Sequence, residues 1–332
     1  MTKKFLYLIC LTFVFSIKAE GKLASVNNID IWWEGFGNNN HTPVILIMGI
    51  NTNSKRWPLE LINGLVENNL YVIIFDNRDS GKSTWLTKEP LISKFIKYTP
   101  RALKEYLVNE MFKQDEDQRF EMGGTFVYNL NDMAKDTISL MNYLNINQAH
   151  VVGASMGGMI GQVIALDYPE RVLTLTSIMS TPGFDTEGLP GPTSEYMEAL
   201  RESIVLGMEG KHKESLRLVY KSALGSKYPF DEERFERMLA IRMDHGNNLF
   251  SGHTMAVGAS PNRYSRLNEI LKPTLIIHGN EDPLIPVEHG LATASQIQNS
   301  EVIIMEGVGH NFPLPIVPDL VKGMVNHFNK IQ

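Results

Sequence analysis

One serine of this chain stands in a context that could make it a nucleophile. Ser155 is the centre of Gly153-Ala154-Ser155-Met156-Gly157, which matches the pattern G-x-S-x-G. The pattern lies directly after a strand-like apolar run, 149–153, and directly before a helical pattern over 156–168. A tight turn from strand to helix would expose the serine Oγ at the end of the strand, where the helix N-terminus points at it. We therefore predict that Ser155 is catalytic.

A serine hydroxyl is a weak nucleophile unless a base takes its proton and an acid holds that base. In this arrangement both partners are expected later in the chain, the acid before the base. Asp282 follows the apolar run 273–279, and His310 follows the apolar run 300–306. Because ligands bind at the carboxyl ends of strands in open α/β sheets, we expect both side chains near Ser155. Glu281, adjacent to Asp282, is the alternative acid.

Acyl chemistry also needs hydrogen-bond donors for the negative charge that develops on the carbonyl oxygen, and backbone N–H groups can supply them. One is expected from Met156, the residue after the serine. The other is expected from Ile50, which follows the apolar run 43–49. Nearby, the side chains of Asn51 and Asn53 could add donors to a substrate.

The elements that would position these residues alternate along the chain. Six apolar runs lack polar alternation and are rich in β-branched residues: 43–49, 71–76, 149–153, 172–178, 273–279 and 300–306. Such runs are typical of strands buried on both faces of a parallel sheet. Helical patterns lie between them, so the sequence predicts a doubly wound, mostly parallel α/β sheet. Residues 23–26 and 30–34 precede it as a predicted antiparallel edge hairpin.

Two segments interrupt this alternation. Residues 181–264 contain helical stretches and no strand-like run, so they predict a helical cap inserted between two late strands. Residues 86–127 form a second helical insertion, in which Leu103, Tyr106 and Leu107 give an apolar face. The sheet core would then comprise residues 20–180 and 265–332. Both insertions leave at the carboxyl edge, so we expect their apolar faces to roof the site. The alternative is that residues 86–127 pack only against the outside of the cap.

The N-terminus is predicted to be a separate segment. Lys3 and Lys4 precede a 13-residue apolar run that ends at Ile17, and Ala19 offers a small residue for cleavage. This pattern is typical of a secretory signal peptide over residues 1–19, and the run is short for a membrane span. We expect a secreted or periplasmic protein whose membrane contact is through this segment alone. An uncleaved anchor and a buried first helix are the alternatives.

Composition excludes several classes of protein. The chain has 332 residues, 43% of them hydrophobic, which argues against disorder. A net charge of −6 argues against a nucleic-acid partner. One cysteine and the absence of paired-histidine spacing give no metal site, and no cofactor is expected. Residues 76–83 imitate a phosphate-binding loop, but Asp76 stands where that motif needs glycine, so we expect Asp76 and Arg78 to pair across a turn.

The chain resembles the α/β-hydrolase superfamily and, within it, the aclacinomycin-methylesterase-like branch. The similarity extends from about Ile29 to Phe328 and is carried by the segments 46–49, 56–58, 75–84, 153–158, 162–171, 279–286 and 307–310. It implies that Ser155 is the nucleophile, Asp282 the triad acid and His310 the base. The chain departs from the family in its long insertion at 86–127 and in having Met48-Gly49 where His-Gly is usual.

The function that we expect is hydrolysis of a carboxylic ester of a small to medium apolar substrate through an acyl-enzyme intermediate. Acyl transfer or carbon–carbon bond hydrolysis with the same triad is an alternative. A catalytically inactive hydrolase fold that serves as a binding protein is a third possibility. The presence of all three triad residues in the expected order argues against it, because a binding module needs none of them together.

Overall fold

The computed structural model describes residues 21–88, 93–113, 127–246 and 251–331. The predicted signal segment therefore lies outside the described residues, as do parts of the insertion 86–127. Eight strands form one sheet in the order β1-β2-β4-β3-β5-β6-β7-β8. Their bounds are β1 Lys22–Val26, β2 Ile29–Phe36, β3 Thr42–Ile47, β4 Leu70–Phe75, β5 Ala149–Ala154, β6 Val172–Ile178, β7 Thr274–Gly279 and β8 Ser300–Met305.

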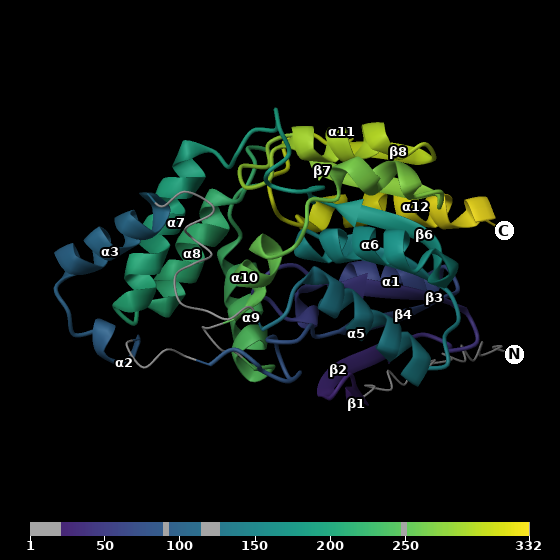
Figure 1. The fold of residues 1–332 in the computed structure, drawn as a ribbon, viewed down its shortest axis with the longest axis horizontal. Helices are drawn as coiled ribbons and strands as arrows, with labels where there is room; N and C mark the ends of the chain where they lie inside the picture. The colour runs from purple at the N-terminus through teal and green to yellow at the C-terminus, as the bar shows by residue number, and fades with distance from the viewer. Residues whose placement is uncertain (1–20, 89–92, 114–126, 247–250, 332) are drawn as a thin grey trace, which may run out of the picture.

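Strands β3 to β8 are parallel to their neighbours, while β2 pairs antiparallel with both β1 and β4. The doubly wound, mostly parallel sheet and its antiparallel edge hairpin are thus confirmed. Among the described residues, five helices flank this sheet: α1 Leu59–Glu67, α5 Leu130–Tyr143, α6 Met156–Asp167, α11 Val287–Gln296 and α12 Val317–Phe328. Figure 1 shows how they lie along the sheet.

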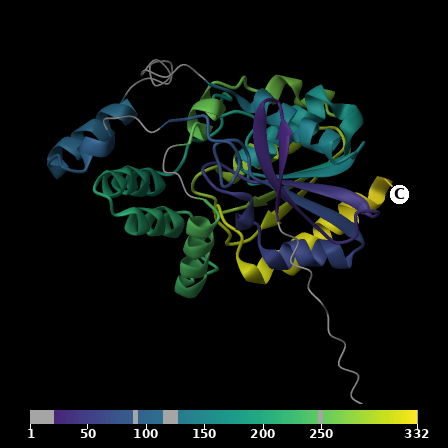
Figure 2. The same ribbon diagram turned by 90° about the horizontal axis from the view of Figure 1, so that it is seen from below.

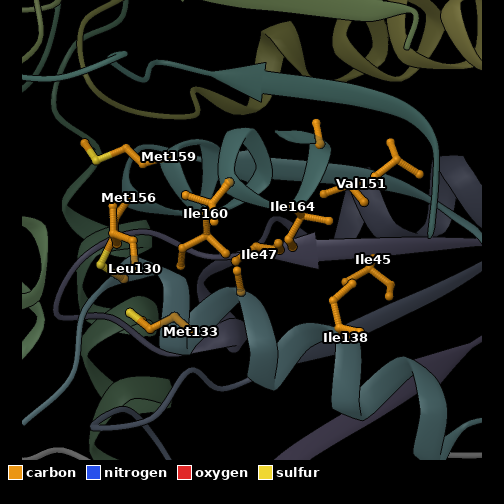
Figure 3. Packing of buried hydrophobic residues seen from close by; sticks show 14 of the residues in the cluster. Ile45, Ile47, Leu130, Met133, Ile138, Val151, Met156, Met159, Ile160 and Ile164 are labelled. Carbon is orange, nitrogen blue, oxygen red and sulfur yellow. The ribbon is translucent and has the colours of Figure 1, made fainter. Parts of the chain in front are cut away.

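Alternate residues of the central strands enter two separate cores. Ile45, Ile47 and Val151 pack with α5 and α6 on one face, as the side chains in Figure 3 illustrate. Val44 and Leu46, on the same strand as Ile45, pack with α1 and α12 on the other face. Since both faces are covered, neither can be polar, which is why these strands lack an alternating pattern.

The segment between β6 and β7 is helical in its described part, as predicted. It contains α7 Ser194–Met208, α8 His212–Ser222, α9 Glu232–Asp244 and α10 His253–Gly258, followed by the 3₁₀ helix η3 Tyr264–Glu269. We call residues 181–264 the cap. Among the described residues, no helix is both long and apolar enough to cross a bilayer.

The other insertion contributes α2 Ser93–Ile96 and α3 Arg101–Lys113. Figures 1 and 2 both place α3 at the end of the cap that is farthest from the sheet. Helix α3 packs against α7, and its buried residues are Lys104 and Val108. The prediction that the apolar face of α3 is buried over the site is therefore wrong, because Leu103 and Tyr106 are 43% and 59% exposed.

Candidate active site

Ser155 occupies a strained turn between β5 and α6. Its φ is 55° and its ψ is −120°, a conformation that L-residues rarely adopt outside functional sites. Both glycines of the motif are sterically required. A Cβ on Gly153 would lie 2.0 Å from the carbonyl oxygen of Gly157, and one on Gly157 would lie 2.0 Å from that of Ile47. The G-x-S-x-G spacing thus allows α6 to start directly against β3 and β5.

The structure brings the three predicted triad side chains into one chain of hydrogen bonds. Ser155 Oγ lies 3.1 Å from His310 Nε2, and His310 Nδ1 lies 2.7 Å from Asp282 Oδ2. Asp282 lies just after β7 and His310 just after β8, so all three come from the carboxyl ends of parallel strands. With Nδ1 donating to the carboxylate, Nε2 is the acceptor for the serine proton. This is the geometry of a nucleophile, its base and the group that orients the base.

Asp282 is buried, 4% exposed, and would not remain charged there without partners. Burial alone would raise its pKa. The electrostatic interaction with His310, together with hydrogen bonds from His310 and the amide of Ile285, outweighs burial and holds the pKa below its ordinary value. Its second oxygen accepts from the amides of Leu284 and Ile285 at 3.0 and 2.8 Å. The carboxylate therefore stays ionised and can stabilise an imidazolium.

Glu281, the alternative acid, has a different partner. Its carboxylate accepts hydrogen bonds from the amide of Ser226 at 2.5 Å and from the Ser226 hydroxyl at 2.8 Å. Ser226 belongs to the cap, between α8 and α9. The structure thus separates two neighbouring carboxylates, one directed at the base and one fastened to the cap.

The cap also contacts the loop that carries the base. The amide of His310 donates to the carbonyl of Ala223 at 2.8 Å. A Cβ on Gly225 would lie 2.4 Å from the carbonyl oxygen of Gly307 and 2.7 Å from the amide of Gly309. The two backbones approach so closely that only glycines fit at this junction.

The loop after β3 lies beside the nucleophile. A Cβ on Gly49 would be 3.1 Å from Ser155 Cβ. The next amide, that of Ile50, has no acceptor among the described residues. Met156 is the first residue of α6, and a first helical residue has no intrahelical acceptor for its N–H. Neither of the two amides predicted for the oxyanion hole has a backbone acceptor among the described residues.

The structure does not bring Asn51 and Asn53 together with the triad. Both line a cavity of about 10 Å³ with Asp79, Ser80 and Ser251, and neither Ser155 nor His310 belongs to its wall. A space of this size holds about one water molecule. The substrate-binding role of the two asparagines stays a prediction. The amide of Asn51 donates instead to Nδ1 of His253 at 2.9 Å.

The expected ion pair between Asp76 and Arg78 is wrong. Arg78 forms a two-point ion pair with Asp136 of α5, at 2.7 and 2.8 Å. Asp76 accepts from the amide and hydroxyl of Ser54, the amide of Lys82 and the Nε2 of His245. Asp76 therefore joins the loop after β3, its own loop and the cap. Partners this distant in sequence leave no local pattern.

Within the described part of the chain, no group of three or more His, Cys, Asp or Glu side chains is arranged to hold a metal ion. Asn77, His245 and His253 were not predicted from the sequence. Asn77 donates to the carbonyl of Met48 and His253 accepts from the amide of Asn51, both in the loop after β3, while His245 bonds to Asp76 in the loop after β4. Asn77 follows an apolar run and so carried a positional signal. The two histidines lie in the cap and carried none.

Comparison with known proteins agrees with this geometry. Residues 42–315 match the family model described as alpha/beta hydrolase fold. Rhodomycin D methylesterase DnrP of Streptomyces peucetius is 26% identical over 327 residues, which cover 92% of this chain and 97% of the relative. A 2-hydroxy-6-oxononadienedioate/2-hydroxy-6-oxononatrienedioate hydrolase of Paraburkholderia phymatum is 31% identical, but it covers 52% of this chain and 59% of its own length.

Solved structures share the fold at lower identity. An esterase from Exiguobacterium antarcticum has a TM-score of 0.68 at 19% identity and covers 93% of this chain and 100% of its own. The enol-lactonase of Burkholderia xenovorans has a TM-score of 0.66 at 17% identity, with 93% and 100% covered.

Proposed function

This chain belongs to the alpha/beta hydrolase fold family and is related to methylesterases and esterases. From that premise we propose that it is a serine hydrolase of carboxylic esters. The observation that carries the proposal is the hydrogen-bonded chain Ser155–His310–Asp282 on a strained strand-to-helix turn. The substrate class that we propose is a small to medium apolar ester.

The reaction proceeds in two halves. Ser155 Oγ attacks the ester carbonyl while His310 Nε2 takes its proton, and Asp282 stabilises the resulting imidazolium. The N–H groups of Ile50 and Met156 hold the negative oxygen of the tetrahedral intermediate. His310 then gives its proton to the departing alcohol. In the second half His310 deprotonates a water, which attacks the acyl-enzyme and releases the acid and the free serine.

Two observations support an apolar ester in particular. The ring of Phe312, two residues after the base, packs on the ring of Trp57 with centroids 5.4 Å apart. Trp57 follows the loop of Ile50 and is buried in the core cluster that Phe312 also contacts, so the neighbourhood of the two loops that carry Ile50 and His310 is apolar. The methylesterase relative aligns over 92% of this chain.

The test is a series of p-nitrophenyl esters of increasing acyl length, assayed with the wild-type protein and with Ser155→Ala. We expect turnover of short and medium esters that Ser155→Ala lacks. If the wild-type protein hydrolyses none of these esters and does not react with a fluorophosphonate, the chain is a binding protein and the proposal fails.

The second candidate is cleavage of a 2-hydroxy-6-oxo acid, because relatives named for that activity match about half of the chain. The same triad would serve. A wild-type protein that reacts with a fluorophosphonate, leaves all the esters intact and consumes 2-hydroxy-6-oxononadienedioate would favour this candidate over the ester.

We also propose that residues 1–19 direct export and are removed. The support is the Lys3-Lys4 pair, the 13-residue apolar run and Ala19. N-terminal sequencing of the exported protein should begin near Glu20. A chain that still starts at Met1 in the membrane fraction would indicate an anchor.

A further inference from the structure

The loop after β3 is fastened to the loop after β4 at several points. The carbonyl of Met48 accepts from Asn77 Nδ2 at 3.1 Å, and the carbonyl of Thr52 accepts from Ser80 Oγ at 2.7 Å. One further connection, between Asn51 and Arg78, is indirect and passes through His253. Residues 76–83, which imitate a phosphate-binding loop, thus hold in place the loop after β3 that carries the predicted oxyanion donor Ile50.

His253 is a fully buried side chain at the start of α10, in the cap. Its Nδ1 lies 2.9 Å from the amide of Asn51, and its Nε2 lies 2.6 Å from the carbonyl oxygen of Arg78. A backbone N–H can only donate and a carbonyl can only accept. These partners require a neutral ring with its proton on Nε2. Burial lowers the pKa of His253, which agrees with a neutral ring.

These contacts enclose the amide of Ile50 from both sides. Asn77 fixes the peptide group between Met48 and Gly49, and His253 fixes the one between Ile50 and Asn51. The peptide group that lies between them carries the Ile50 N–H. Gly49 has no side chain to restrict it, and Asn51 has a φ of 53°, which costs free energy unless neighbours hold it. Without His253, this peptide group would be free to turn away from Ser155.

We propose that His253 is a positioning residue: by accepting a hydrogen bond from the Asn51 amide, it orients the Ile50 N–H toward the oxygen that becomes negative during attack by Ser155. The inference rests on the proposed serine chemistry. It also gives the cap a role in rate, because α10 supplies the residue that holds the peptide next to an oxyanion donor, 202 residues farther along the chain than Asn51.

Two substitutions of His253 test its two hydrogen bonds one at a time. In His253→Asn, the side-chain oxygen can reach the position of Nδ1 and still accept from Asn51. In His253→Gln, the side-chain nitrogen can reach the position of Nε2 and still donate to Arg78, while the acceptor is lost. His289→Gln is the matched control. His289 is likewise buried, and it joins the cap to α11 by bonds to Thr181 and to the carbonyl of Pro190.

The measurement is the second-order rate of labelling by a small fluorophosphonate, because this reaction needs the oxyanion donors and does not depend on the natural substrate. We expect His253→Gln to lower the rate by about 10–100-fold, less than complete loss of an oxyanion donor. We expect His253→Asn to stay within about 3-fold of wild type, and His289→Gln to change the melting temperature but not the rate. With an ester that the protein hydrolyses, kcat should fall and KM should change little.

A wild-type rate in His253→Gln would overturn the proposal. So would equal losses in His253→Gln and His253→Asn that follow their melting temperatures, since that is the result of a purely structural role. If His253→Gln does not fold, Asn77→Ala tests the same mechanism from the other side of Gly49 and should lower the labelling rate while His253 is intact. Absence of ester turnover with normal labelling would count against the ester substrate and not against His253.

Discussion

The cap and the α2–α3 insertion both leave the carboxyl edge of the sheet, yet they contact different parts of the molecule: the cap contacts the loops of the candidate site, and the insertion contacts the cap. The cap reaches the loops of the active site through polar groups and close backbone contacts. Ala223 accepts from the amide of His310, Ser226 donates to Glu281, and His253 accepts from the amide of Asn51. Its contacts with the core are therefore placed where chemistry is expected.

The described part of the α2–α3 insertion contacts the cap. Arg101 of α3 pairs with Glu202 and Glu209 of the α7 region, and Lys104 donates to the carbonyls of Lys97 and Thr99. Tyr106, by contrast, is 59% exposed. The comparison teaches that an apolar stripe on a helix does not by itself identify the surface that the helix packs against. Here a lysine is among the buried residues of α3, and its ammonium group bonds to two carbonyls of its own insertion.

The largest expected effect separates the carboxylate that serves the base from the one that fastens the cap. Asp282→Asn should lower kcat about 10⁴-fold, because it removes the charge that orients and stabilises His310. Glu281→Gln should lower kcat less than about 10-fold, because it weakens only the bonds to Ser226. Steady-state kinetics on the best ester would measure both. The opposite ranking would mean that the acid has been assigned to the wrong residue.

A smaller effect is expected where the cap backbone meets the loop of the base. Gly225→Ala puts a Cβ against the backbone of Gly307 and Gly309, so His310 must shift. We expect kcat to fall about 10–100-fold and stability to fall by about 1–3 kcal/mol. Urea unfolding and kinetics would check both.

Gly207→Ala is the control for that variant. Gly207 lies within α7 of the same cap, and the nearest atom to its Cβ position is 3.9 Å away. It should gain about 0.5–1 kcal/mol of stability with kcat unchanged. Unaltered kcat in Gly225→Ala would show that the junction does not position the base.

The smallest effect is expected on α3. Tyr106→Ser should change stability by no more than about 0.5 kcal/mol and leave kcat/KM unchanged along an ester series. Val108→Ala, at a site 1% exposed, should cost on the order of 1–3 kcal/mol because it leaves a cavity beneath α7. A change of acyl-length preference in Tyr106→Ser would show that the substrate reaches this helix.

Sequence alone predicted the parts of the site that depend on local order. Runs such as 43–49 gave buried parallel strands, and residues that directly follow a strand, such as Asp282, were expected at the carboxyl edge. Spacing could not give contacts made at long range by single side chains. Arg78 pairs with Asp136 rather than Asp76, and His253 reaches Asn51 from the cap. The face of α3 that is buried is decided by its contact with α7, and the apolar spacing within α3 does not predict where α7 lies.

The central claim, that Ser155 is the nucleophile, is tested most directly by mass spectrometry of the protein after reaction with a fluorophosphonate. The account predicts one adduct per chain, located on the peptide that contains Ser155. Ser155→Ala should remain folded, form no adduct, and have kcat lowered about 10⁴-fold or more on any ester that the wild-type protein hydrolyses. An adduct on another residue, or more than a tenth of wild-type turnover in Ser155→Ala, would contradict it.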